Sequence, residues 1–224
     1  MFLHPNTQLV PLRSTSDPVR MLLALPIGDN INWLIKTGRL KMGESLVILG
    51  TGQKAAAAVL IGRLAGAYPI IVVARPQSKR IELFRSLADY VFTGDGKEVV
   101  NSVAKITNRK MASVVIELTY ADALKAPALA VKLAGLEGRV VQVADHSGLD
   151  IPLPLDDLLI NYLSVLGTNG HDYEDYKQAA ELLERGAFPL AEKLPIPTFR
   201  LEQIEEVFEK QPHKEGGVFP AIVF

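Results

Sequence analysis

A short apolar strand that turns directly into a helix is the feature that most limits what this chain can fold into. The strand Leu46–Leu49 is followed at once by Gly50-Thr51-Gly52, and an alanine-rich stretch then runs to Gly66. A second apolar run begins at Ile70. Glycines at such a point allow a tight turn that offers the N-terminus of a helix to a phosphate group. The pattern G-x-G-x-x-A, lying between a strand and a helix, predicts a β-α-β unit and a site for a dinucleotide.

Alternating strand-like and helix-like segments continue through most of the chain. Because most of the strand-like runs are apolar on both faces, they are typical of a parallel sheet with helices on both sides. By analogy with dinucleotide-binding folds, we predict an α/β fold of the Rossmann type, with a doubly wound parallel sheet of six strands in the order 3-2-1-4-5-6. The predicted strands begin at Leu46, Ile70, Asp89, Ser113, Gly138 and Leu163.

The same pattern divides the chain into three parts. Residues 1–40 are expected to form an N-terminal arm and linking helices, which Pro26 and Gly28 interrupt. Residues 41–190 are expected to form the dinucleotide-binding domain. Residues 191–224 hold an extended segment, one amphipathic helix and a last strand. Since these do not form another β-α-β unit, we expect a small C-terminal extension.

Composition and charge exclude several kinds of protein. The chain has 24 basic and 25 acidic residues, so its charge gives no reason to expect nucleic acid or an anionic membrane as a partner. It has no cysteine, which excludes disulfides, thiolate metal sites and thiol nucleophiles. No apolar run approaches the ~20 residues that span a bilayer, and the first residues lack the pattern of a signal peptide. We therefore expect a cytoplasmic protein.

Several segments, taken in order, resemble the medium-chain dehydrogenase/reductase family, the group of alcohol, sorbitol and threonine dehydrogenases. The resemblance runs from about Met21 to Phe224. It implies a Rossmann-type domain that binds a nicotinamide dinucleotide, and an oxidoreductase activity. The segments that carry it are residues 43–52, 138–141, 151–167, 182–186 and 199–208.

The chain departs from this family at its N-terminal side. Family members begin with a large β-rich catalytic domain, and almost all of that domain is missing here. In the zinc enzymes the metal ligands come from that domain, and many relatives have a ligand glutamate where this chain has Leu25, before Pro26. The resemblance therefore implies a member without zinc. It also implies that residues 191–224 are the remnant of the catalytic domain.

The glycine turn is the predicted binding site for the diphosphate of the cofactor. Gly50, Thr51 and Gly52 allow the backbone to approach the phosphates, and the amides near Gln53 and Lys54 would face them. The alternative is a strand-to-helix turn that binds nothing.

Lys54 is unusual in the family, where relatives carry an aliphatic residue at this position. Its charge could attract the diphosphate, or its side chain could occupy the groove. Alternatively, the side chain extends past its apolar neighbours into solvent.

The segment after the second strand predicts the choice of cofactor. NAD-binding proteins place an acidic residue there for the ribose 2′-hydroxyl, but this segment has no acid and several cations. A carboxylate would repel a 2′-phosphate, whereas an arginine can bind one through two hydrogen bonds. We therefore predict NADP(H) over NAD(H), with Arg75 as the main contact and Ser78, Lys79 or Arg80 assisting. The alternative is an ordinary basic start to a helix.

The ends of the fourth and fifth strands are where this family holds the nicotinamide and its ribose. The resemblance implies backbone contacts from Thr119, Val143 and Ala144. His146 and His171 lie in loops near the same edge, and either could donate a proton, as could Tyr120. The alternative is that these side chains are simply solvated.

The predicted sixth strand, from Leu163 to Gly167, would lie at the edge of the sheet. An apolar edge can pair with another chain, and in this family the equivalent strand joins two subunits. We predict a two-fold homodimer through this strand. The alternative is that the C-terminal segment covers it.

Two functions follow. The first is a zinc-free oxidoreductase that moves hydride between NADP(H) and a small carbonyl, alkene or alcohol. The second is a non-catalytic cofactor-binding domain, either part of a larger dehydrogenase that needs a companion catalytic domain or a sensor or partner-binding protein.

Overall fold

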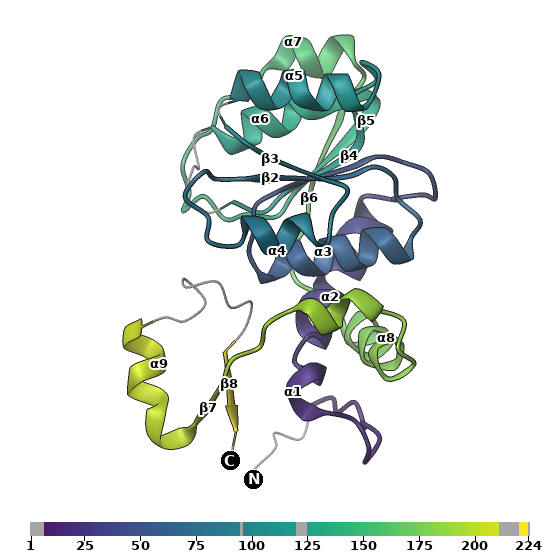
Figure 1. Ribbon diagram of the computed structural model, residues 1–224. Coiled ribbons are helices and arrows are strands. Elements are labelled where there is room, and N and C mark those ends of the chain that lie inside the picture. Colours follow the sequence, from purple (N-terminus) through teal and green to yellow (C-terminus); the bar gives the residue numbers. More distant parts are fainter. Residues whose placement is uncertain (1–6, 95, 120–124, 211–219, 224) are drawn as a thin grey trace.

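The computed structural model describes residues 7–94, 96–119, 125–210 and 220–223. Its centre is a six-stranded sheet in the order β3-β2-β1-β4-β5-β6, in which every neighbouring pair is parallel (Figure 1). The predicted doubly wound Rossmann-type fold is confirmed. The strands are β1 (Leu46–Leu49), β2 (Ile70–Ala74), β3 (Tyr90–Thr93), β4 (Ala112–Glu117), β5 (Ala134–Gln142) and β6 (Ser164–Gly167).

Helices cover both faces of the sheet (Figure 1). One face carries α3 (Gln53–Leu64) and α4 (Ile81–Arg85). The opposite face carries the three helices α5 (Gly96–Ile106), α6 (Ala126–Leu133) and α7 (Leu155–Ile160).

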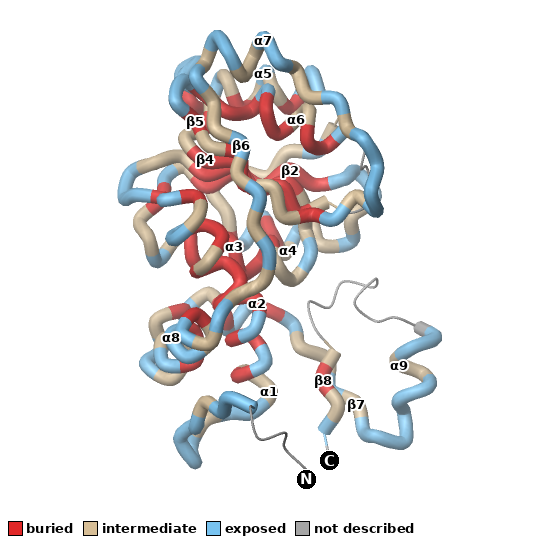
Figure 2. The backbone as a smooth tube through the Cα atoms, turned by 180° about the vertical axis from the view of Figure 1, so that it is seen from behind, coloured by how far each residue is buried: buried red, intermediate tan, exposed pale blue. Residues whose placement is uncertain are grey.

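Two separate apolar cores result from this arrangement. Alternate residues of a strand point to opposite faces, so Leu46 and Ile48 join the core beneath α3. Val47 and Leu49 join the core beneath α5 and α6. Every residue of β1 and β2 is apolar and buried, as expected for central strands with helices on both faces. Figure 2 shows the buried residues concentrated in the sheet and in the helices packed on it.

The N-terminal helices belong to the core beneath α3. The chain forms α1 (Pro18–Met21), α2 (Ala24–Asn30) and the π-helix η1 (Ile31–Thr37). The helical segment is divided as expected, but the break lies at Leu22 and Leu23, and the prediction that Pro26 and Gly28 interrupt it is wrong, since α2 runs through both. Pro26 is tolerated because it lies in the first turn of α2, where its nitrogen has no hydrogen bond to lose. Ile27 and Trp33 are fully buried, so this segment packs as an integral layer beside α3.

The helix after β6 is α8 (Tyr173–Glu184), which packs against α2. Asp172 is its N-cap and accepts a hydrogen bond from the amide of Asp175 at 2.9 Å. Asp175 returns the interaction to the amide of Asp172, which completes a capping box and fixes where the helix begins.

The strands begin within one residue of their predicted starts, except for β5. Between β2 and β3 the chain forms only the short helix α4, because the amide of Ser78 bonds to the carbonyl of Arg75 at 2.9 Å and forms a turn ahead of it. The fifth strand begins at Ala134 rather than Gly138. A Cβ on Gly135 would lie 1.9 Å from the carbonyl oxygen of Lys110, so only glycine permits this early contact with the start of β4.

The short helix η2 (Pro189–Lys193) still belongs to the main domain, with Ala191 buried in the core beneath α3. Beyond it the C-terminal part leaves the main domain (Figure 1) and contains β7 (Thr198–Arg200), η3 (Leu201–Gln203), α9 (Ile204–Lys210) and β8 (Ala221–Val223). β7 and β8 pair in parallel as a small separate sheet. Phe208 is 72% exposed, so the apolar face of α9 is not covered by the described residues.

None of the helices in the described part of the chain is both long and apolar enough to cross a bilayer.

Candidate functional site

The glycine turn joins the end of β1 to the start of α3. Gly50 has a φ of +122°, and a Cβ there would lie 3.3 Å from the carbonyl oxygen of Leu118, so the fold itself requires glycine. Gly52 differs, because its backbone is extended, with φ −81° and ψ −176°. A Cβ on Gly52 would meet no atom within 4 Å. The fold therefore leaves open space above the first turn of α3.

This open space fits a diphosphate. Within the described chain no side chain caps α3, so the amides of its first turn remain available to a ligand. The helix has 12 residues, and its dipole favours negative charge at this end. Glycine at position 52 lets a phosphate approach the backbone closely, which a side chain would prevent.

Three predicted cofactor residues form a brace between this turn and the loop after β2. The hydroxyl oxygens of Thr51 and Ser78 lie 2.8 Å apart, and Nη1 of Arg80 donates to the carbonyl oxygen of Thr51 at 3.1 Å. The amide of Arg80 also donates to the Ser78 hydroxyl at 3.3 Å. Burial lowers the pKa of Arg80, although a guanidinium keeps its proton in proteins. Arg80 thus holds the two loops together, while Lys79 is exposed.

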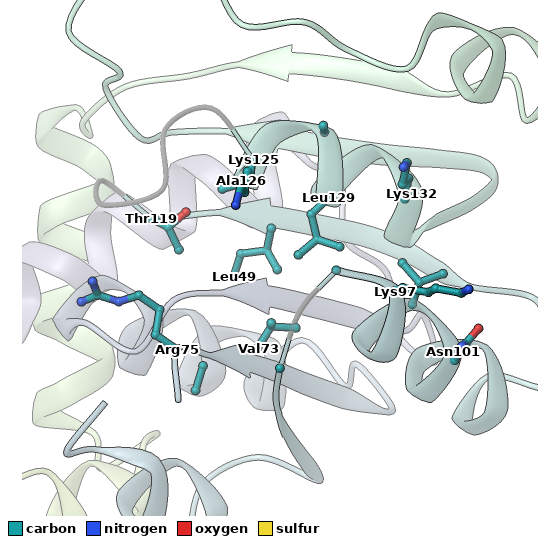
Figure 3. Close-up of a pocket in the computed structure, with 15 residues that line it drawn as sticks. Leu49, Val73, Arg75, Lys97, Asn101, Thr119, Lys125, Ala126, Leu129 and Lys132 are labelled. Carbon is teal, nitrogen blue, oxygen red and sulfur yellow. The ribbon is translucent and has the colours of Figure 1, made fainter. Parts of the chain in front are cut away.

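Arg75 lies at one end of a cleft of about 760 Å³ above the carboxyl ends of β1, β2 and β4. Leu49, Val73 and Leu129 form an apolar floor, and Thr119 lies at the same end as Arg75 (Figure 3). The other cations of the cleft are Lys97, Lys125 and Lys132, and none of its lining residues is acidic. An apolar floor with a cationic rim suits an aromatic base that carries phosphate groups.

Lys54 turns toward the N-terminal helices. Its amino group lies 5.0 Å from the centre of the Trp33 ring, a cation–π contact with η1. Its carbonyl oxygen accepts a hydrogen bond from Nδ2 of Asn30 at 3.0 Å. The first turn of α3 is therefore tied to both α2 and η1.

Glu117 is a site residue that the sequence analysis did not single out. It ends β4 and is fully buried. Its carboxylate accepts hydrogen bonds from the amide of Thr119 at 2.6 Å, from the Thr119 hydroxyl, and from Nε2 of Gln142 at 2.7 Å. The amides of Val143 and Ala144 both approach its carbonyl oxygen at 3.3 Å. Glu117 thereby gathers the three backbone positions that were predicted to contact the nicotinamide half of a cofactor.

In the sequence, this cluster could have been recognised from Glu117, an acidic residue directly after the apolar run 114–116. His146 belongs to it, with Nε2 3.3 Å from the Glu117 carboxylate and 3.0 Å from Nε2 of Gln142. Its side chain is nine-tenths buried, so it is not simply solvated. Tyr120 lies outside the described residues.

His171 is separate from this cluster. Its Nδ1 lies 2.7 Å from Oδ1 of Asp29, a buried residue of α2. It lines a second cavity, of about 500 Å³, which also includes Leu25. The described part of the chain contains no group of three or more His, Asp or Glu side chains that could hold a metal ion.

β6 pairs only with β5 within the described part of the chain, so its outer edge is not covered by the C-terminal sheet. The predicted alternative, in which the C-terminal segment covers this strand, is therefore wrong for the described residues. Beside it, Leu159 and Tyr162 are 75% and 73% exposed. Val165, in β6 itself, is 40% exposed.

The sequence of this chain is similar to the sequences of known dehydrogenases. Residues 55–185 match the family model of the zinc-binding dehydrogenases. The protein named "Probable alcohol dehydrogenase adh" of Mycobacterium tuberculosis is 28% identical over 98% of this chain and 60% of its own length. L-threonine 3-dehydrogenase of Pyrococcus abyssi is 29% identical over 86% of this chain and 54% of its own length.

A solved structure shows the same fold. It is described as a zinc-binding dehydrogenase from Sinorhizobium meliloti 1021 bound to NADP, and it has 24% sequence identity and a TM-score of 0.83. The alignment covers 95% of this chain and 61% of that one. The chain thus spans only about 60% of such proteins. With the family model matching more than half of its residues, the chain belongs to the zinc-binding dehydrogenases of the medium-chain dehydrogenase/reductase family.

Proposed function

We propose that this chain binds NADP(H) and acts as a zinc-free oxidoreductase, moving hydride to or from a small carbonyl, alkene or alcohol. The observation that carries the proposal is the open space above Gly52, at the uncapped start of α3. Arg75, in a cleft without acidic residues, favours NADP(H) over NAD(H). The relative solved with NADP supports this choice.

Each half of the cofactor has residues of this chain to hold it. The amides after Gly52 would bind the diphosphate, and Arg75 would bind the 2′-phosphate. The adenine would lie on the apolar floor that includes Leu49. Thr119, with the backbone at 143–144, would hold the nicotinamide half. When bound, the cofactor supplies the hydride, while the protein supplies orientation.

The absence of zinc, the homodimer and the cytoplasmic location are part of this proposal. Leu25 occupies the position where the resemblance implies a metal-binding glutamate in many relatives, and its aliphatic side chain cannot bind a metal. The exposed apolar region beside β6 supports pairing between two copies of the chain.

Fluorescence titration of the protein with NADPH and NADH tests the cofactor assignment. We expect NADPH to bind at least ten times more tightly, because a second phosphate gains a charge-assisted contact with Arg75. Equal affinities would reject NADP specificity. Consumption of NADPH with a panel of ketones and enones then tests catalysis.

A second candidate function rests on exposed apolar surface. Leu22, Leu25 and Phe208 are 44%, 50% and 72% exposed, although single exposed apolar residues are common. Their occurrence on α2, on α9 and directly after α1 favours a cofactor-binding domain that docks on a companion catalytic domain. NADPH binding without turnover, followed by turnover when such a domain is added, would support this function.

A further inference from the structure

A carboxylate and a histidine form a pair that the proposed cofactor site does not use. Nδ1 of His171, in the loop after β6, lies 2.7 Å from Oδ1 of Asp29 on α2. The imidazole also stacks against the ring of Tyr176 on α8, with the ring centres 5.9 Å apart. The ring is therefore fixed by contacts with two different helices.

The hydrogen bond to Asp29 decides what the other ring nitrogen can do. An ionised carboxylate only accepts hydrogen bonds, so Nδ1 must carry the proton that joins the two groups. In the described residues, Nε2 of His171 has no hydrogen-bond partner. It can accept a hydrogen bond when the ring is neutral and donate one when the ring is charged.

His171 contributes to the wall of a cavity of about 500 Å³ that is otherwise mostly apolar. The other lining residues are Leu22, Leu25, Tyr176 and Pro220. A pocket with apolar walls and one oriented polar group is typical of a small-molecule site. The volume suits a molecule of several carbon atoms with a single oxygen.

Asn30 links the Asp29–His171 pair to the start of α3, directly after the glycine turn. Asn30, which follows Asp29, donates from Nδ2 to the carbonyl oxygen of Lys54 in the first turn of α3. His171 also follows β6, on the half of the sheet opposite to Arg75, which follows β2. In a doubly wound sheet the two halves of a dinucleotide lie on opposite sides of the switch point. His171 is therefore on the side of the nicotinamide half.

We propose that His171, oriented by Asp29, binds the oxygen of a small ketone or alcohol whose apolar body fills this cavity. This inference rests on the proposed function, since it names the substrate class of the same oxidoreductase. The neutral ring accepts from an alcohol, and the charged ring donates to a ketone. The His171–Asp29 pair would thus bind the substrate oxygen directly, in a protein where the aliphatic side chain of Leu25 cannot bind a metal ion.

The direct test is ¹⁵N NMR of histidine-labelled protein titrated with cyclohexanone and with cyclohexanol, without cofactor. We expect the Nε2 signal of His171 to move on addition of either probe. An Nε2 signal that stays unchanged at saturating probe would overturn the proposal.

Variants give a second measurement. We expect His171→Ala to weaken cyclohexanone binding about tenfold or more, as for loss of a charge-assisted hydrogen bond. Asp29→Asn should weaken it less, because the ring keeps its Nε2 atom and loses only the carboxylate that orients it. Glu181→Gln, on the solvent side of α8, is the matched control and should bind the probe normally. Wild-type affinity in His171→Ala would contradict the proposal; if that variant does not fold, Asp29→Asn and the NMR titration decide.

NADPH titration of the same samples separates this inference from the proposed function. Probe binding at His171 without NADPH binding would leave the cavity site standing and reject the cofactor assignment. NADPH binding without any probe contact at His171 would leave the cofactor assignment standing and reject the cavity site.

Discussion

The hydroxyl oxygens of Thr51 and Ser78 lie 2.8 Å apart and join the glycine turn to the loop after β2. Arg80 strengthens the same junction by donating to the carbonyl oxygen of Thr51 at 3.1 Å. As a result, the turn that would hold the diphosphate and the loop that carries Arg75 form one rigid unit. The distance between the two proposed phosphate-binding positions is then set before any ligand binds, which would reduce the entropy cost of binding.

Arg75→Ala should lower the affinity for NADPH by about ten- to a hundredfold and leave NADH affinity nearly unchanged, because only NADPH carries the 2′-phosphate. Arg85→Ala, an exposed arginine of α4, is the matched control and should change neither affinity. Fluorescence titration with both nucleotides measures the effect. An equal loss for both nucleotides would show that Arg75 does not read the 2′-phosphate.

Gly52→Ala and Gly50→Ala should separate binding from folding. Since a Cβ on Gly52 meets no atom within 4 Å, the first variant should keep its stability but lose NADPH affinity. Gly50→Ala should lower the free energy of unfolding by about 1–3 kcal/mol, because alanine is strained at a φ of +122°. Urea denaturation and NADPH titration of both variants test this pair. Normal NADPH binding by Gly52→Ala would place the diphosphate elsewhere.

Glu117→Ala should destabilise the fold by about 3–5 kcal/mol, because the buried groups that bond to this carboxylate would lose their partner. Glu117→Gln keeps the shape and should cost less. Urea denaturation measures both. Glu181→Gln, on the exposed face of α8, should have no measurable effect on stability. A stability of Glu117→Ala equal to that of the wild type would mean that the cluster does not hold the strand ends together.

Acid should release the segment before α1 from α8. The hydroxyl of Ser16 and the amide of Arg13 bond to the Glu184 carboxylate, and these contacts lower its pKa. A lowered folded-state pKa means that the contribution to stability is present above the ordinary glutamate value, about 4.3, and is lost as the pH falls through the lowered value. The protection of the Arg13 amide against hydrogen exchange, taken relative to the intrinsic exchange rate at each pH, should therefore fall in that range. In Glu184→Gln the exchange should be fast at neutral pH and should depend little on this titration.

Val165→Arg should convert the expected homodimer into a monomer, since a charge on the outer side of β6 opposes strand pairing. Thr93→Arg, on β3 at the opposite edge of the sheet, is the matched control. Light scattering at several protein concentrations gives the mass. A wild-type protein that is monomeric at all concentrations would reject pairing through β6.

Local patterns were sufficient to predict the sheet. The apolar runs at 46–49 and 70–74 specify buried parallel strands whatever else the chain contains, because each run must lose its whole apolar surface to helices. The glycine turn was equally predictable from its local pattern, whereas the closeness of Gly50 to the carbonyl oxygen of Leu118 is a property of the tertiary structure. The cleft with Arg75 followed from the same reasoning, because carboxyl ends of parallel strands share one edge.

The sequence by itself therefore determined the fold class, the strand order and the place of the proposed dinucleotide site. Only the tertiary structure decided which polar side chains meet. Asp29 and His171 are 142 residues apart, and Arg80 turned out to brace Thr51, 29 residues away, rather than to stand free beside Arg75. The physical reason is that strands and turns follow from short-range patterns, whereas a buried polar group is stable only with a partner that the packing of distant segments supplies.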